Sequence, residues 1–161
     1  MYKKEDYVVY KHDVCKIKDT KENKQMGNTY YVMTPIDDDT LIINIPIDNK
    51  MGFLRDIISS ADAEKLIERI PKIKPLEDIN EKNIEAEYKE MLNTGIHDNL
   101  IKIIKTTYLR NENRINSKKK ISEKDNTYFK LAEKYLYNEL AVSLNKSIEE
   151  IKEYIFEKVS K

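Results

Sequence analysis

The chain has 161 residues, 36% of them charged, and its 29 basic and 29 acidic residues give a formal net charge of zero. No overall field attracts such a protein to nucleic acid or to an anionic membrane, so any attraction of this kind must be local. The apolar runs are far shorter than the roughly 20 residues that span a bilayer, and MYKKEDYVVY lacks the apolar core of a signal peptide. We therefore expect a cytoplasmic protein without membrane contact, in which the single cysteine, Cys15, is a plain buried residue.

The first part of the chain contains four candidate β-strands separated by turn signals. They are rich in Val, Ile and Tyr, as a pleated surface favours, and they read DYVVY (6–10), DVCKI (13–17), TYYVM (29–33) and TLIINI (40–45). The polar segment 18–28, with Gly27, and the segment that begins at Pro35 are typical of turns. Pro46 limits further pairing after the last run. The short connections predict a small, strongly bent antiparallel sheet or barrel.

Helix signals begin after residue 52. Ser59 or Ser60 can cap a helix over residues 61–69, which Pro71 ends. The segment PKIKPLEDIN carries two prolines and is typical of a hinge. We therefore predict an α+β protein: a β-rich domain over residues 1–70, a proline hinge over 71–79 and an all-helical domain over 80–161.

The helical domain shows three further helices with clear end signals. One carries the apolar stripe Ile84, Tyr88, Met91 and Leu92 and closes at Thr94-Gly95. The strongest starts after Ser122, an N-cap with Asp125 at the third helical position. The last starts at the S-x-x-E capping box of Ser147 and Glu150.

A fourth helix, within residues 99–120, concentrates positive charge. Residues 102–120 carry seven basic residues and one acid, whereas residues 76–101 carry seven acids and two lysines. Helical spacing predicts an apolar back of Leu100, Ile104, Tyr108 and Ile115, and a basic front with Lys102, Lys105, Thr106 and Arg110. Two interpretations remain open: the front binds a polyanion, or the acidic and basic stretches neutralise each other across adjacent helices.

Signals for catalysis and metal binding are scarce. There are two histidines, His12 and His97, and three glycines, without a metalloprotease, nucleophile-elbow or phosphate-loop motif. His97 is expected to serve as a helix cap or to face solvent. Asp37, Asp38 and Asp39 lack the Gly and the closing Glu of a calcium loop, so we expect a solvated turn. We expect no enzyme, and no catalytic residue, metal, cofactor or small-molecule substrate.

Six pieces of the chain, taken in order, resemble the CarD/CdnL family of bacterial RNA polymerase-binding transcription regulators, especially its shorter Firmicutes-like forms. They are DYVVYKHDVCKI, YYVM, LIINIPIDN, FLRDIISSADAEKLI, IIKTTYLRNENR and LAEKYLYNELAVSLNKSIEEIKEYI. The resemblance covers residues 6–157. It implies a Tudor-like N-terminal domain that binds the RNA polymerase β subunit, and a helical domain that contacts promoter DNA and stabilises the open complex.

The same resemblance implies which residues face the polymerase. The implied surface is the strand near residues 41–46 with its neighbour at 30–33, and strand addition to a sheet edge is the expected mode. Some members have one arginine at the position of Asn44 and another at the position of Thr20. In this chain Thr20 is followed by Lys21. The candidate polymerase-binding residues are Thr20, Lys21, Tyr31, Ile43, Asn44, Ile45 and Pro46.

The implied DNA contact departs from the family pattern, because the tryptophan and arginines usual before Tyr88 are replaced by Ile84, Ala86 and Glu87. Ile84 is either a DNA wedge or part of the packing stripe. The candidate DNA-binding residues are Lys89, Lys102, Lys105, Arg110, Arg114, Lys118, Lys119 and Lys120, and the contact should be weak and largely sequence-independent. The alternative function is a protein–protein interaction adaptor that does not touch DNA.

Overall fold

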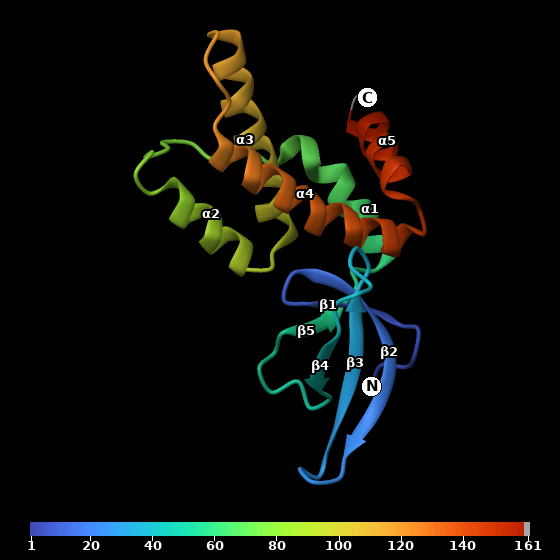
Figure 1. Ribbon diagram of the computed structural model, residues 1–161. Coiled ribbons are helices and arrows are strands. Elements are labelled where there is room, and N and C mark those ends of the chain that lie inside the picture. Colours follow the sequence, from blue (N-terminus) through green and yellow to red (C-terminus); the bar gives the residue numbers. More distant parts are fainter. Residues whose placement is uncertain (160–161) are drawn as a thin grey trace. The chain divides into compact units, whose positions relative to one another are not determined.

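The structure is a computed structural model in which residues 1–159 are described. Contacts divide the chain into two compact units, residues 1–58 and residues from Ser59 onward. Within the described residues the first unit holds all the strands and the second all the helices, which confirms the predicted α+β class (Figure 1).

The first unit is a five-stranded antiparallel sheet with the order β4-β3-β2-β1-β5. Its strands are β1 (Tyr7–Tyr10), β2 (Asp13–Asn23), β3 (Asn28–Pro35), β4 (Ile43–Pro46) and β5 (Leu54–Asp56). All four predicted strands are present, but the predicted turn at 18–28 is mostly strand. Residues of β2 as far as Asn23 pair with β3 in a long hairpin (Figure 1), so ladder hydrogen bonds outweigh the polar composition of this segment. The three residues of β5 carry no periodic signal and become a strand by pairing with β1.

One face of the sheet carries the core of this unit. Its buried members are Val8, Cys15, Ile17, Tyr31, Met33, Ile45 and Leu54. Cys15 is fully buried, as expected, and burial raises the pKa of its thiol to about 12, which makes it a poor nucleophile.

The second unit contains five α-helices within the described residues. They are α1 (Ser60–Arg69), α2 (Ile84–Asn93), α3 (His97–Asn116), α4 (Glu123–Leu144) and α5 (Ile148–Val159), with a short 3₁₀ turn, η1, at Ile70–Lys72. The predicted caps are in place, because Ser59 accepts from the Asp62 N–H and Ser122 accepts from the Asp125 N–H. None of the helices described between residues 1 and 159 is long and apolar enough to cross a membrane.

The division between the units falls at residues 58/59 and not near residue 70. Helix α1 belongs to the helical unit, where Ala63, Leu66 and Ile67 are buried and Glu64 accepts a hydrogen bond of 2.5 Å from the hydroxyl of Tyr154 on α5. The predicted hinge at 71–79 therefore lies inside the helical unit. The two prolines end α1 and shape the connection to α2, but the boundary is set by the apolar face of α1, which needs the other helices to bury it.

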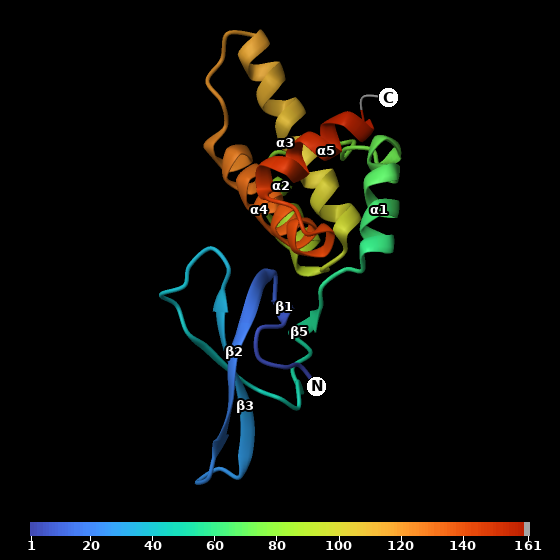
Figure 2. The ribbon, with the colours of Figure 1, turned by 90° about the vertical axis from the view of Figure 1, so that its right-hand side faces the viewer.

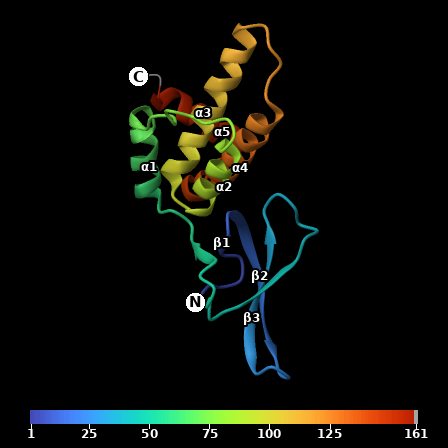
Figure 3. The same ribbon diagram turned by 90° about the vertical axis from the view of Figure 1, so that its left-hand side faces the viewer.

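Helix α3 buries Leu100 of the predicted apolar back, but the rest of its inward face differs from the prediction. Leu100, Ile101, Ile103, Thr106 and Thr107 are buried, whereas Tyr108 and Ile115 of the expected apolar back are more than half exposed. The C-terminal part of α3 projects beyond the neighbouring helices (Figures 2 and 3), so apolar residues there find no core to enter.

Candidate functional site

Strand β4 forms one edge of the sheet, with β3 as its neighbour on one side only. The Ile47 N–H donates to the Thr29 carbonyl, and the register pairs Ile45 with Tyr31. Because antiparallel residues alternate in the direction of their backbone groups, Ile45 and Ile47 bond to β3 while Asn44 and Pro46 present theirs to the free edge. Pro46 has no N–H to lose there, which explains why a proline is tolerated in this strand. The Pro46 carbonyl already accepts from the Asn49 N–H at 3.3 Å, so the edge offers the N–H and C=O of Asn44.

The residues along this edge are uncharged. Asn44 and Pro46 are exposed, and the side chains of Leu41 and Ile42 just before the strand are 49% and 64% exposed. Proteins usually protect an edge strand with lysine, proline, a bulge or a covering segment, and of these β4 has Pro46, which leaves Asn44 as the position suited to an added strand. This edge is thus suited to main-chain pairing with another polypeptide.

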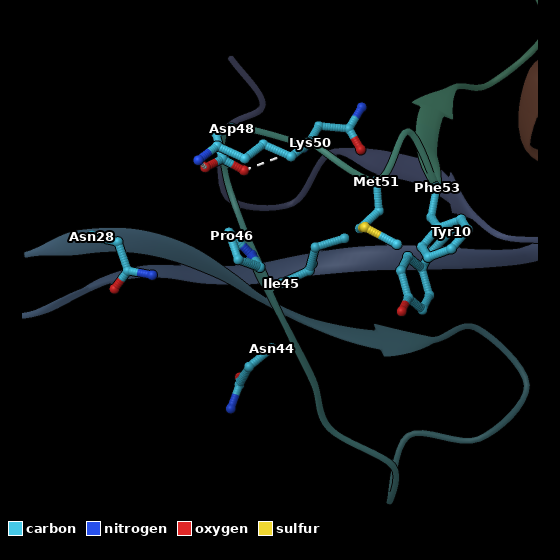
Figure 4. Close-up of a pocket in the computed structure, with 10 residues that line it drawn as sticks. Tyr10, Asn28, Asn44, Ile45, Pro46, Asp48, Lys50, Met51 and Phe53 are labelled. Carbon is cyan, nitrogen blue, oxygen red and sulfur yellow. Dashed lines mark hydrogen bonds and ion pairs between the residues drawn. The ribbon is translucent and has the colours of Figure 1, made fainter. Parts of the chain in front are cut away.

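A cavity of about 470 Å³ lies beside the edge (Figure 4). Its lining includes Ile45 and Pro46 of β4 together with Tyr10, Met51 and Phe53. The rings of Tyr10 and Phe53 meet edge to face with their centroids 6.3 Å apart. Figure 4 also shows Asp48 beside Lys50 at the rim. Their charged groups are 3.9 Å apart, so the two opposite charges neutralise each other. The cavity therefore suits an uncharged, bulky side chain.

The structure separates the predicted polymerase-binding residues into accessible and enclosed groups. Asn44 and Pro46 lie at the edge, and Thr20 and Lys21 are exposed on β2, two strands inward. Tyr31 is 2% exposed, so its side chain cannot be a docking residue. Ile43 and Ile45 likewise pack on the core face, and Ile45 also lines the cavity.

In the helical unit, two predicted DNA-binding arginines are bound inside the protein. The Asp125 carboxylate is fully buried at the start of α4. It accepts from Arg110 Nε at 2.9 Å, from Arg114 at 2.8 Å and from the Tyr88 hydroxyl at 2.9 Å. Arg110 also donates to Glu81 at 2.6 Å. These arginines lie on the side of α3 that faces the other helices. They pair there with Asp125 because a buried carboxylate requires partners of opposite charge.

This network sets the ionisation of its members. Burial acts to raise the pKa of Asp125, but the hydrogen bonds from Arg114, Arg110 and Tyr88 outweigh it and hold that pKa below the ordinary value. Burial, together with the bond to Asp125, raises the pKa of the Tyr88 hydroxyl. Asp125 therefore stays ionised and the Tyr88 hydroxyl stays protonated at neutral pH, and their hydrogen bonds join α2, α3 and α4.

Lys105 is also structural and not part of an exposed basic front. Its ammonium donates to the Ile70 carbonyl and, at 2.6 Å, to the Ile73 carbonyl. Burial lowers the pKa of this group. The Ile70 carbonyl also accepts from the Ile73 N–H at 3.1 Å, so Lys105 adds a second donor there and ties the segment after α1 to α3.

The remaining predicted DNA-binding residues are accessible. Lys118, Lys119 and Lys120 lie in the exposed loop between α3 and α4. Lys89 is exposed and pairs with Glu85 at 3.4 Å. Lys102 is half-buried near the start of α3. Ile84, the candidate wedge, is fully buried and belongs to the packing stripe.

The structure also places the groups considered for catalysis or metal binding. His97 does not face open solvent: its Nε2 lies 2.9 Å from a carboxylate oxygen of the buried Glu139 on α4. In the aspartate turn, Asp38 accepts from the backbone N–H and hydroxyl of Thr40. Across residues 1–159 there is no group of three His, Cys, Asp or Glu side chains that could hold a metal ion.

Sequence reasoning misses two sets of residues that the structure makes prominent. The sequence indicates Asp125 only as part of a helix cap, and only the structure shows that it pairs with Arg110 and Arg114 of the preceding helix. Lys72 and Lys74 stand out in the sequence only as part of a proline-rich segment. A scan against protein-family models found no match to this chain, and a search of curated proteins found no relative.

Proposed function

We propose that this chain is a transcription regulator that binds the β subunit of bacterial RNA polymerase and stabilises the promoter open complex. The proposal rests on the resemblance to the CarD/CdnL family and on one structural observation, the uncharged free edge of β4. The small antiparallel sheet fits the Tudor-like domain that the resemblance implies. A strand of the β subunit would pair with Asn44 and place a bulky side chain in the cavity beside Ile45.

In this proposal, promoter contact comes from the lysines that remain accessible. Arg110, Arg114 and Lys105 are engaged inside the helical unit, so the exposed loop of Lys118–Lys120 carries the contact. A protein without net charge would bind free duplex weakly, and docking on polymerase supplies the effective concentration that makes weak contacts sufficient.

Substituting Asn44 tests the docking edge. Asn44→Pro removes an N–H that faces away from β3, so the sheet keeps its ladder while the added strand loses a hydrogen bond and meets the proline ring. We expect at least about a tenfold weaker binding to a β-subunit fragment, measured by titration calorimetry with the full chain. Asn44→Ala keeps the N–H and should bind like the wild type. Equal binding by both variants would refute strand addition.

A second candidate, an interaction adaptor without DNA contact, is favoured by the pairing of Arg110 with Glu81. This pair joins the basic and acidic stretches across two segments of the helical unit, as neutralisation of one stretch by the other requires. The loop lysines distinguish the two functions.

Replacing Lys118, Lys119 and Lys120 together by glutamine is expected to shorten the lifetime of open complexes formed with polymerase. The reason is that up to three phosphates are no longer neutralised, while binding to the β-subunit fragment should not change. Competitor-challenge assays on a melted promoter measure this lifetime. An unchanged lifetime with intact polymerase binding would favour the adaptor.

A further inference from the structure

A hollow of about 560 Å³ lies on the helical unit, between the segment that follows α1 and the beginning of α3. Three lysines line it: Lys72 and Lys74 from the segment, and Lys102 from α3. Lys72 and Lys74 are exposed and Lys102 is half-buried. Positive charge is thus gathered at a concave surface, away from the loop of Lys118–Lys120.

The backbone that carries Lys72 and Lys74 is fastened to α3. Lys105 holds the carbonyls of Ile70 and Ile73, on either side of Lys72. Beyond Lys74, the Leu76 N–H donates to the Thr106 hydroxyl at 2.9 Å. Ile73, between the two lysines, is buried. Because this backbone is already ordered, binding a partner would cost side-chain entropy but little backbone entropy.

The charges around the hollow are not balanced. Two acids, Glu77 and Asp98, also line it. Asp98 is already held by Arg69, whose Nε and terminal nitrogen donate to it at 3.1 Å and 2.8 Å. Within residues 1–159, Lys72, Lys74 and Lys102 form no ion pair. The hollow therefore favours an anionic occupant.

We propose that this lysine hollow binds phosphates of a nucleic-acid backbone. Lysines without a fixed hydrogen-bonding fork act as point charges, and such contacts position a duplex without reading its sequence. This inference rests on the proposed function and adds to it a second phosphate contact. From Lys102 to the end of α3 at Asn116 is about 21 Å along the helix axis, so the hollow is separate from the loop of Lys118–Lys120.

The test compares two triple variants of the full chain with equal changes in charge. K72Q/K74Q/K102Q neutralises the hollow, and the control K4Q/K18Q/K24Q neutralises three exposed lysines of the first unit. Affinity for a short duplex oligonucleotide is measured by fluorescence anisotropy over a series of low salt concentrations. We expect the hollow variant to bind more weakly and the slope of log affinity against log salt to flatten by about 0.9 for each phosphate that the hollow no longer neutralises. The control should keep the slope of the wild type, and thermal unfolding should not change in either variant.

Three results would overturn the inference. They are a wild-type chain that binds no duplex at low salt, a hollow variant with the same slope as the control, and a hollow variant that keeps duplex binding but loses the β-subunit fragment. The last result would assign the hollow to an acidic protein surface. Failure of the wild type to bind the β-subunit fragment would refute the proposed function instead, and the salt slopes would still report on the hollow.

Discussion

Replacing Asp125 with alanine is expected to lower the free energy of unfolding by about 3 kcal/mol. The substitution leaves the largely buried guanidinium groups of Arg110 and Arg114 without their shared carboxylate, and the Tyr88 hydroxyl without its acceptor. Breaking a buried ion pair from one side typically costs about 3–5 kcal/mol. The lower end applies here because Arg110 keeps Glu81. Urea unfolding followed by circular dichroism measures the change.

A matched control lies in the first turn of the same helix. Glu123 is exposed, so Glu123→Ala should change stability by no more than about 0.5 kcal/mol. If the two variants unfolded at the same urea concentration, Asp125 would not be a structural anchor. Arg110 and Arg114 would then be available for DNA after all.

The same carboxylate gives a dependence of stability on pH. Its folded-state pKa lies below the ordinary value of about 3.9, so its contribution is present above that pH and is lost as the pH falls through the folded-state pKa. The stability difference between the wild type and Asp125→Ala should therefore shrink below about pH 4. A difference that stays constant into stronger acid would contradict the charge pairing.

Replacing Ile84 with alanine is expected to cost about 3 kcal/mol of stability. Ile84 is fully buried at the start of α2, so the substitution loses its transfer free energy and leaves a cavity. The result decides between the two sequence interpretations of this residue. A wedge would shorten the lifetime of open complexes without changing the urea midpoint, whereas a core residue lowers the midpoint.

Ile115 provides the control for this substitution. It is 53% exposed near the end of α3, and Ile115→Ala should change stability by no more than about 0.5 kcal/mol. An Ile84→Ala protein as stable as Ile115→Ala would show that Ile84 leaves the core in solution and would restore the wedge.

Local signals predicted most of the fold. Serines at Ser59, Ser122 and Ser147 marked the starts of three helices because a hydroxyl can accept from an N–H of the first turn, a requirement that depends on neighbours in sequence. Runs rich in Val, Ile and Tyr marked four strands because these side chains favour a pleated surface. The part of β2 after Ile17 and the whole of β5 were not predicted, because these residues become strand by pairing with β3 and β1.

The candidate sites were predicted less well, since the chemistry of a lysine or an arginine depends on what lies beside it. Composition alone could not distinguish Lys102, which lines an open hollow, from Lys105, which holds two carbonyls three residues further along the same helix. Similarly, Asn44 and Tyr31 lay in neighbouring predicted strands. The sheet order places Asn44 at a free edge, and the direction of its side chain places Tyr31 in the core.

The sequence by itself determined the α+β class, the helix caps, the buried Cys15 and the concentration of basic residues between 102 and 120. The tertiary structure decided which of those basic residues are accessible. Arg110 and Arg114 of α3 neutralise the buried Asp125 carboxylate, which would be costly without partners, and Lys105 of α3 donates to the Ile70 and Ile73 carbonyls after α1. Part of the basic helix supports the fold and is not a binding surface, because its partners lie in a segment far away in the sequence that packs against it.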